Sequence, residues 1–247
     1  LPENGAALNY TQVFFRWSQI PNAESYQFTL QNMATGEELE LNVLENSVLQ
    51  TDFMDWNSTY TWFICALFGD GETPFCSEIY SFDVSPLPDY FPDIINVSMY
   101  DETLYQDGVT IMDFESLNFS GGLDRDGNPI WFADKYNNAE DFIFTQFLPN
   151  GNVVGFGEGS GYETDLNGNI IFETPDNIGV HHKFYKTAQN TYFLISGTVQ
   201  NQYCPEECNP SLPDQIPWQG DIFRELDSEG EVIWNWNTFD YIDSTEY

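Results

Sequence analysis

Short apolar runs separated by turn residues fill the chain from residue 9 to about residue 84. Tyr26, Phe28 and Leu30 alternate with polar neighbours, which is the period of a half-buried β-strand. The same reasoning predicts further strands at 13–17, 38–44, 60–67 and 76–84. Short strands at this spacing predict a β-sandwich over residues 1–84.

A repeated phrase dominates the second half of the chain: an Asp or Asn, a Gly, one or two polar residues, then an apolar run. Copies lie at 124–131, 165–172 and 227–234, with a looser copy at 148–154 and a degenerate one at 187–193. Asn-Gly or Asp-Gly between apolar runs indicates a β-hairpin, because the tight turn needs a positive φ. Hairpins repeated along a chain are typical of a repeat architecture.

The hairpins group into larger units. Residues 142–172 form one four-stranded unit, 182–196 and 221–236 form another across a long loop at 197–219, and 113–132 form at least half of a third. Repeated four-stranded antiparallel units predict the blades of a β-propeller, so the fold class is all-β. Residues 93–247 then hold about two and a half blades, fewer than the roughly four that close a propeller.

Two expectations concern organisation. The proline-rich segment 85–92, which includes Ser85-Pro-Leu-Pro88, reads as a stiff linker between the sandwich and the partial propeller. Because open sheet edges favour aggregation, we expect either a longer polypeptide or copies of this chain that complete each other's sheets.

The net charge of −34 restricts the partners. Such an anionic surface repels phosphate backbones and anionic membrane surfaces, so nucleic acid is not expected as a partner. No run approaches the roughly 18 apolar residues of a membrane span, so membrane insertion is not expected. The charge either keeps the protein soluble in a salty extracellular setting or binds divalent cations through clustered carboxylates.

Cysteines and glycosylation sequons point to an oxidising location, extracellular or at the cell surface, with the periplasm as an alternative. The sequons begin at Asn9, Asn57, Asn96 and Asn118, and the cysteines are Cys65, Cys76, Cys204 and Cys208. Cys204 and Cys208 either form a small disulfide that pinches the 197–219 loop or belong to a metal site.

The first domain resembles a fibronectin type III domain. The resemblance rests on an early Trp17, an Ala-x-x-Tyr-x-Phe strand that begins at Ala23, and a Tyr-x-Trp strand that begins at Tyr60. It implies a spacer or a binding module, of which we expect a spacer. Cys65 and Cys76 would then lie on hairpin-neighbour strands, where a cross-strand disulfide fits.

The second domain resembles the amino-terminal part of arylsulfotransferase-type β-propellers. The matching stretches are 91–94, Gly108, 123–131, 147–153, 181–184 and the most specific one, 220–236. The resemblance implies transfer of a sulfuryl group between phenols through a histidine that is transiently sulfated. Neutral imidazole can attack sulfur, and cations stabilise the charge that spreads over the sulfate oxygens.

His181 and His182 are the candidate catalytic residues and the only histidines. The family has an acid after the pair, whereas this chain has Lys183. If both histidines lie on one strand, their side chains point to opposite faces, so only one can act. The alternative is a pair of strand-end histidines that are satisfied by local hydrogen bonds.

Arg224 and Trp218 are the candidate substrate-binding residues. Arg224 could bind a sulfate or a sugar acid bidentately, but an ion pair with Glu225 or Asp227 is the competing expectation. Trp218, with Trp234 and Trp236, could stack a phenolic or glycan ligand, although core packing is the default for aromatic strand residues.

No cofactor is expected, and Ca2+ is the one ion to weigh. Asp124-x-Asp126-x-Asn128 has the alternating oxygen ligands of a calcium loop but lacks the rest of that motif, so a simple turn is favoured.

Two functions therefore stand. The protein is an arylsulfotransferase-like enzyme that uses His182 or His181, or it is a catalytically silent extracellular adhesive or structural propeller protein that self-associates.

Overall fold

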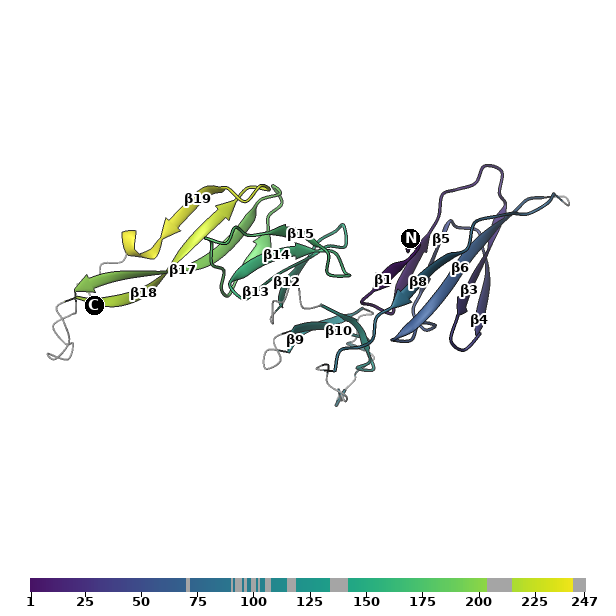
Figure 1. Ribbon diagram of the computed structural model, residues 1–247, viewed down its shortest axis with the longest axis horizontal. Helices are drawn as coiled ribbons and strands as arrows, with labels where there is room; N and C mark the ends of the chain where they lie inside the picture. Colours follow the sequence, from purple (N-terminus) through teal and green to yellow (C-terminus); the bar gives the residue numbers. More distant parts are fainter. Residues whose placement is uncertain are drawn as a thin grey trace. The chain divides into compact units, whose positions relative to one another are not determined.

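The computed structural model describes residues 1–69, 72–89, 91, 95, 97–98, 101, 103–104, 108–114, 119–133, 142–203 and 215–241. These residues form an all-β protein of several separate sheets, none of which is closed (Figure 1). The one helical element among them is a 3-10 turn, η3 (Thr238–Asp240). The described residues contain no helix long and apolar enough to cross a membrane.

Two sheets form the amino-terminal region and share one core. The larger has the order β1-β8-β6-β3-β4, with β7 paired to β6, and the smaller pairs β2 with β5. Their bounds are β1 Ala6–Leu8, β2 Val13–Arg16, β3 Ser25–Asn32, β4 Glu38–Val43, β5 Ser47–Gln50, β6 Ser58–Leu67, β7 Phe75–Cys76 and β8 Tyr80–Val84. Phe15 of β2, Phe28 of β3 and Tyr60 of β6 are completely buried between the sheets.

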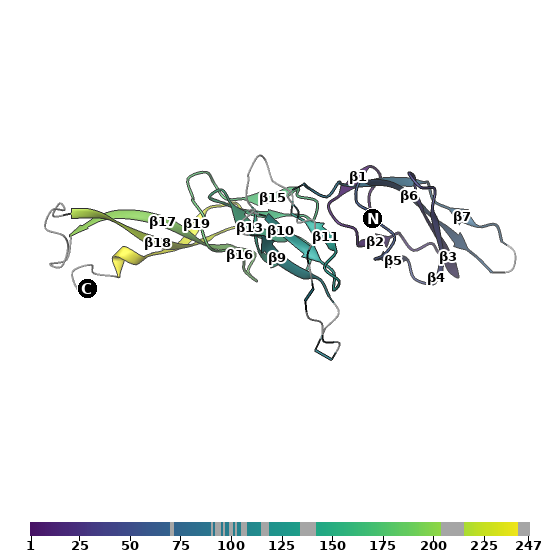
Figure 2. The same ribbon diagram turned by 90° about the horizontal axis from the view of Figure 1, so that it is seen from below.

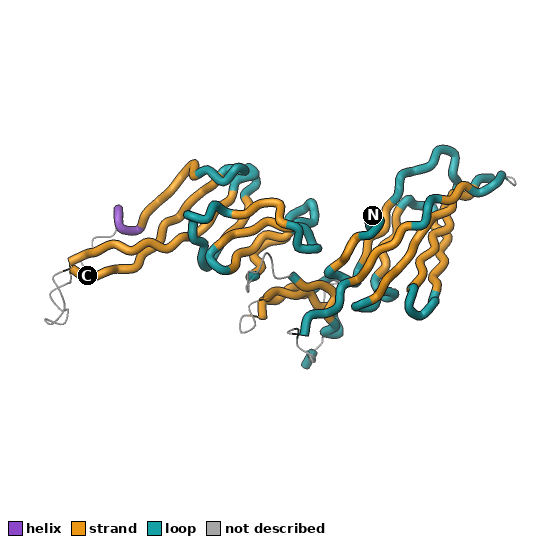
Figure 3. The backbone as a smooth tube through the Cα atoms, viewed as in Figure 1, coloured by secondary structure: helices purple, strands orange, loops and turns teal. Residues whose placement is uncertain are grey.

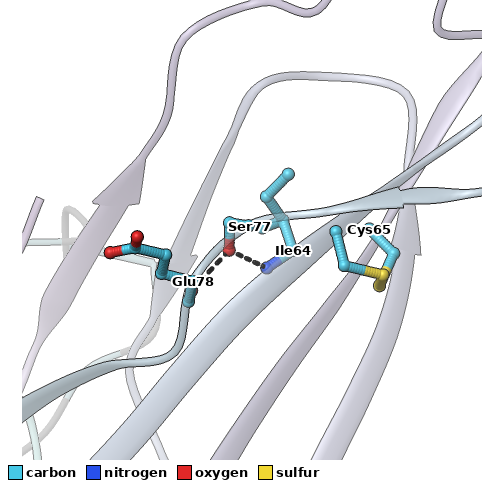
Figure 4. The surroundings of a disulfide bond; sticks show 5 residues. Ile64, Cys65, Ser77 and Glu78 are labelled. Carbon is cyan, nitrogen blue, oxygen red and sulfur yellow. Dashed lines mark hydrogen bonds between the residues drawn. A yellow bond between two sulfur atoms is a disulfide. The ribbon is translucent and has the colours of Figure 1, made fainter.

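The strands predicted for this region are present, with two differences. The expected strand at 76–84 is split into β7 and β8 at Ser77. The Ser77 N still donates to Ile64 O at 2.8 Å, but Ile64 N donates to the Ser77 Oγ instead of a backbone oxygen, and this Oγ donates to Glu78 O (Figure 4). The short strands β1 and β5 were not predicted. The fibronectin type III assignment remains a prediction.

The expected Cys65–Cys76 disulfide is present. Cys65 and Cys76 lie directly opposite each other on β6 and β7, with their Cα atoms 3.9 Å apart. The bond joins a central strand to the short β7, which has only two residues to pair with it.

The repeat phrases form the hairpins that the sequence predicts. A three-stranded sheet has the order β11-β10-β9, and two four-stranded sheets have the orders β12-β13-β14-β15 and β16-β17-β18-β19. Their bounds are β9 Thr110–Phe114, β10 Phe119–Leu123, β11 Pro129–Phe132, β12 Ile143–Phe147, β13 Val153–Gly157, β14 Ser160–Thr164, β15 Ile170–Glu173, β16 Phe184–Lys186, β17 Tyr192–Tyr203, β18 Gln215–Leu226 and β19 Val232–Asn237.

Each copy of the phrase has a residue with positive φ at the same place in its turn. The φ values are +87° at Gly127, +90° at Gly151, +88° at Gly168 and +89° at Gly230, and Asn190 takes the position in the degenerate copy at +64°. Glycine adopts this conformation freely and asparagine tolerates it, which explains why the phrase keeps these residue types.

The prediction of a long loop over residues 197–219 is wrong. β17 runs on to Tyr203 and β18 already begins at Gln215, and their twelve residues pair without a break from Tyr192↔Leu226 to Tyr203↔Gln215. The long ribbon of β17 and β18 extends past the end of β19 in Figure 1 and past the ends of β16 and β19 in Figure 2. In Figure 3 it appears as two continuous strand tubes.

The residues gather into two compact units, Leu1–Met112 with Gly121–Ala133, and Asp113–Ser120 with Asp134–Tyr247. In the first unit, the segment 9–11 lies beside β11 and pairs with it in the antiparallel sense. Thr11 N donates to Ile130 O at 2.9 Å, and Phe132 N donates to Asn9 O at 3.1 Å. In the second unit, β12–β15 and β16–β19 share a core that includes Val154, Phe172 and Phe184. The domain limits at 84 and 92 remain a prediction.

Candidate functional site

The two histidines lie in the connection before β16, not on a strand. His181 N donates to Ile195 O at 2.9 Å, and Lys183 N donates to His181 O at 2.7 Å. This last bond closes a three-residue turn centred on His182, whose φ is +61°. The expectation that both histidines alternate along one strand is therefore wrong, because the strand begins only at Phe184.

His182 is exposed and has an uncommon backbone conformation. A positive φ in a residue other than glycine costs free energy, and such residues cluster at functional sites. The rings of His181 and His182 are 5.0 Å apart and nearly perpendicular, at 84°. The turn thus keeps both imidazoles together while it points them in different directions.

His181 faces an acid that comes from β18. Its Nε2 lies 3.3 Å from Asp221 Oδ1, and the two side chains are 33% and 46% exposed. Gly197 of β17 pairs with Asp221, and a methyl group at Gly197 would lie 3.6 Å from His181 Nε2, so the ring lies over this part of β17. Nε2 itself is shielded from solvent and makes no hydrogen bond of good geometry to a described residue.

This partner was missed by sequence reasoning. Asp221 belongs to the family-like stretch 220–236, but it is separated from His181 by a hairpin whose true length the sequence did not reveal. A carboxylate near one ring nitrogen of an imidazole favours a proton on that nitrogen by its charge, which leaves the lone pair for chemistry on the other nitrogen. The pair is the arrangement in this region that most resembles a catalytic site.

Arg224 does not join the histidines. In β18, residues at even and odd positions point to opposite faces, so Arg224 lies on the face opposite Asp221. The same alternation separates Arg224 from Glu225, and no ion pair of Arg224 with Glu225 or Asp227 forms in the described part of the chain. The competing expectation of a surface ion pair is therefore wrong.

Trp218 shares the face of Arg224 but is six residues away along β18. At about 3.4 Å per residue the two are roughly 20 Å apart, too far to hold one small ligand. The ring is partly exposed, while its Nε1 is buried. The structure therefore does not bring the four predicted site residues into one pocket.

The Asp124 turn uses its own carboxylate. Asp124 Oδ1 accepts from Asp126 N and Asn128 N at 2.9 and 2.8 Å, and Oδ2 accepts from Asn128 Nδ2 at 2.8 Å. Asp165 makes the same three bonds, and Asp227 makes the two backbone ones. These aspartates thus close hairpin turns, which is the interpretation the sequence favoured.

The remaining predicted sites divide by exposure. Asn57 is exposed, whereas Asn9 is only 5% exposed, so of these two Asn57 is the one that has room for a glycan. Asn96, Asn118, Cys204 and Cys208 lie outside the described residues. Use of the sequons remains a prediction.

A second polar cluster, which the sequence analysis did not find, lies between the two four-stranded sheets. Glu163 of β14 is 1% exposed. It accepts bonds of 2.6 Å each from Lys186 Nζ, Tyr192 OH and Asn152 Nδ2. Lys186 also lies 5.1 Å from the centroid of the Tyr192 ring.

The cluster shifts two pKa values. Burial raises the pKa of Glu163, but the bonds from Lys186, Tyr192 and Asn152 together outweigh it, so the pKa lies below its ordinary value. Burial, followed by the bond to Glu163, raises the pKa of Tyr192 far above its ordinary value. The carboxylate is therefore held ionised and the phenol neutral, and both residues are buried.

A model of one protein family matches residues 82–247, the family described as arylsulfotransferase (ASST). The match covers about two thirds of the chain and includes the repeat hairpins, both histidines, Asp221 and Arg224. The chain belongs to the arylsulfotransferase family. No curated protein matches it.

Proposed function

We propose that this protein is an extracytoplasmic arylsulfotransferase that moves a sulfuryl group between phenolic compounds through a histidine. The observation that carries the proposal is the family match over residues 82–247. The His181–Asp221 pair supports it, because it lies inside the matched region and joins an imidazole to a carboxylate. The disulfide between Cys65 and Cys76 supports an oxidising compartment.

In the proposed reaction His181 is the nucleophile. Asp221 attracts Nε2–H, which leaves the lone pair on Nδ1. Nδ1 forms a bond to the sulfur of an aryl sulfate while the bond between sulfur and the phenolic oxygen breaks, and the phenolate leaves and takes a proton from water. A second phenol then attacks the same sulfur, releases its proton to water and restores the histidine.

His182 is the second candidate for this role, since it is exposed and adjacent. Arg224 is not proposed as a partner of His181, because it lies on the other face of β18. The cations that stabilise the sulfate oxygens are therefore expected from residues other than Arg224.

The test is an assay of sulfuryl transfer from an aryl sulfate to a second phenol. We expect His181→Ala to lower kcat by at least about 10³-fold, since it removes the nucleophile. Asp221→Asn should cause a smaller loss, and Glu229→Gln, an exposed turn residue, should cause none. Transfer that survives His181→Ala and His182→Ala together would overturn the proposal.

The alternative is a catalytically silent adhesive or structural protein that self-associates. The separation of His181 from Arg224 on opposite faces favours it, since the described residues show no imidazole and guanidinium converging on one site. Absence of transfer with every aryl sulfate tried, together with concentration-dependent association of the purified chain, would support this alternative.

A further inference from the structure

The amino-terminal sandwich contains a groove of about 930 Å³, which is within the range of pockets that hold small organic ligands. Its floor is formed by Trp62 and Ile64, two core-facing residues of β6 that are 3% and 2% exposed. Its walls come from the segment 1–4, from Arg16 and the residues that follow it, and from the region between β7 and the start of β8.

Backbone hydrogen bonds hold the segment 1–4 in place as one wall of the groove. Arg16 N, at the end of β2, donates to Leu1 O at 3.1 Å. Gly5 N donates to Ser81 O of β8 at 2.7 Å. The segment therefore bridges from the smaller sheet to the larger one, and the wall is part of the folded sandwich.

A second wall is held by β7. The disulfide between Cys65 and Cys76 ties β7 to β6, and Ser77 N donates to Ile64 O at 2.8 Å. Figure 4 shows Ser77 and Ile64, both of which line the groove, beside this disulfide. Phe75 lies one residue before the disulfide, and its ring is 59% exposed. An exposed ring on a fixed backbone gives a ligand a surface to stack on at little cost in entropy.

Two tryptophans of the groove carry hydrogen-bond donors that the protein does not use. Nε1 of Trp17 and Nε1 of Trp62 are shielded from solvent and make no hydrogen bond to a described residue. Tyr80, which also lines the groove, stacks on Trp62 with ring centroids 5.1 Å apart. A buried donor without an acceptor is unfavourable, so a ligand that brings an acceptor to it after a small side-chain movement gains affinity.

The groove has almost no net charge, unlike the chain as a whole. Arg16 and Glu3 are the two charged side chains among the residues that line it, and their charges cancel. The other polar side chains of the lining are neutral amides and hydroxyls: Asn4, Ser18, Gln19, Asn46 and Ser77. Such a lining suits a ligand that carries many hydroxyl groups and no charge.

Two of the amides are already oriented by the protein. Asn4 Oδ1 accepts from Ser81 N at 2.9 Å, and Asn46 Nδ2 donates to Trp17 O at 2.9 Å. These bonds leave Nδ2 of Asn4 as a donor and Oδ1 of Asn46 as an acceptor for a ligand. The groove thus offers both kinds of hydrogen-bonding group at fixed places beside aromatic rings.

We propose that this groove binds a neutral saccharide, which makes the amino-terminal region a carbohydrate-binding module and not only a spacer. A sugar ring stacks its apolar C–H face on Phe75 or Tyr80. Its hydroxyl groups accept from the indole N–H of Trp62 and bond to the amides. An anionic ligand is disfavoured, because the groove lacks a net positive charge and the whole chain carries −34.

The test titrates the 247-residue protein with neutral trisaccharides and follows the indole N–H signals of isotope-labelled tryptophan by NMR. The probes are cellotriose, maltotriose, mannotriose and tri-N-acetylchitotriose. We expect at least one of them to bind with a dissociation constant of about 0.1–1 mM and to shift the signals of Trp17 and Trp62. Trp234 belongs to the second compact unit and is the internal control, whose signal should not shift.

A pair of exposed phenylalanines provides a matched comparison. Phe75→Ala should weaken saccharide binding by about 5- to 10-fold, because it removes a stacking surface. Phe14→Ala is the control, since Phe14 is 50% exposed and is not among the residues that line the groove, and it should leave the affinity unchanged. Both side chains lie largely in water, so neither variant should unfold the protein.

The neutrality of the ligand has a readout of its own. The affinity should change by less than about twofold between about 0.05 M and about 0.5 M NaCl, because no ion pair is formed. A tenfold loss over this range would overturn the proposal. Shifts of Trp17 and Trp62 with nitrophenyl sulfate at lower concentration than with any trisaccharide would also overturn it, because they would make an aryl anion the occupant.

Two further outcomes would contradict the proposal. One is the absence of any shift at about 10 mM of each trisaccharide. The other is an equal loss of affinity in Phe75→Ala and Phe14→Ala. None of these outcomes depends on whether sulfuryl transfer is observed.

Discussion

The sheets β12–β15 and β16–β19 have the same turns, the same strand order and a glutamate in the same place, yet their corresponding faces differ in burial. The face with Glu163 is sealed by its neighbour, and the face with Glu225 is open. The comparison teaches that the repeat determines where a carboxylate lies, while the neighbouring sheet determines whether it becomes a buried ion pair.

The largest difference between the two sheets should be the loss of unfolding free energy when an aromatic side chain at the equivalent position of each sheet is removed. Phe172→Ala creates a cavity in the shared core and should lower the free energy of unfolding by about 3–5 kcal/mol. Trp234→Ala at the equivalent open position should cost less than about 1.5 kcal/mol, because much of that ring is already in water. Urea denaturation of both variants measures the difference, and equal losses would break the comparison.

Removal of the buried cation should have the next largest effect. Lys186→Met leaves Glu163 buried without its counter-charge and should cost about 2–3 kcal/mol, somewhat less than a completely buried pair because Lys186 is 17% exposed. Lys183→Met is the matched control, since Lys183 is exposed three residues earlier, and should change the unfolding free energy by less than about 0.5 kcal/mol. Similar values for the two variants would contradict the role assigned to Lys186.

The turn chemistry predicts an effect of about 1 kcal/mol. Gly151→Ala places a side chain at φ +90°, where it is strained although no neighbour lies within 4 Å, and should lower the unfolding free energy by about 1–2 kcal/mol. Gly179→Ala also meets no neighbour and has no positive φ, so it should be neutral or slightly stabilising. If Gly179→Ala lowered the unfolding free energy as much as Gly151→Ala, the positive φ of Gly151 could not be the reason for the loss.

The smallest expected effect is on the part of the pH dependence of stability that comes from Glu163. Because the folded protein lowers the pKa of Glu163 below its ordinary value of 4.5, this group stabilises the fold above that pH, and the stabilisation is lost as the pH falls through the lower folded value. Glu163→Gln should flatten the decline in stability between about pH 5 and pH 3. Thermal unfolding of the unsubstituted protein and of Glu163→Gln across this range gives both slopes, and equal slopes would contradict the role assigned to Glu163.

Local chemistry made much of this fold predictable. Gly127, Gly151 and Gly168 each directly follow an Asp or Asn. Few other residue types fit a tight turn that needs a positive φ. The disulfide was predictable because Cys65 and Cys76 fall on neighbouring strands of a predicted sandwich.

Other features depend on contacts between residues far apart in the chain. The ribbon beyond Gly197 alternates only weakly, so its polar residues read as a loop, and its true length became visible only through pairing with β18. The proximity of Asp221 to His181 follows from that pairing, as does the placement of Arg224 on the opposite face. The Glu163–Lys186 pair joins two sheets, so no local sequence pattern predicts it.

The central functional claim is that His181 carries the sulfuryl group. The most direct measurement is mass spectrometry of the protein quenched soon after mixing with an aryl sulfate, without an acceptor. The account predicts an adduct of one sulfuryl group on His181, absent in His181→Ala, retained in His182→Ala, and lost when a phenol is added. An active protein with no adduct, or with the adduct on any other residue, would contradict it.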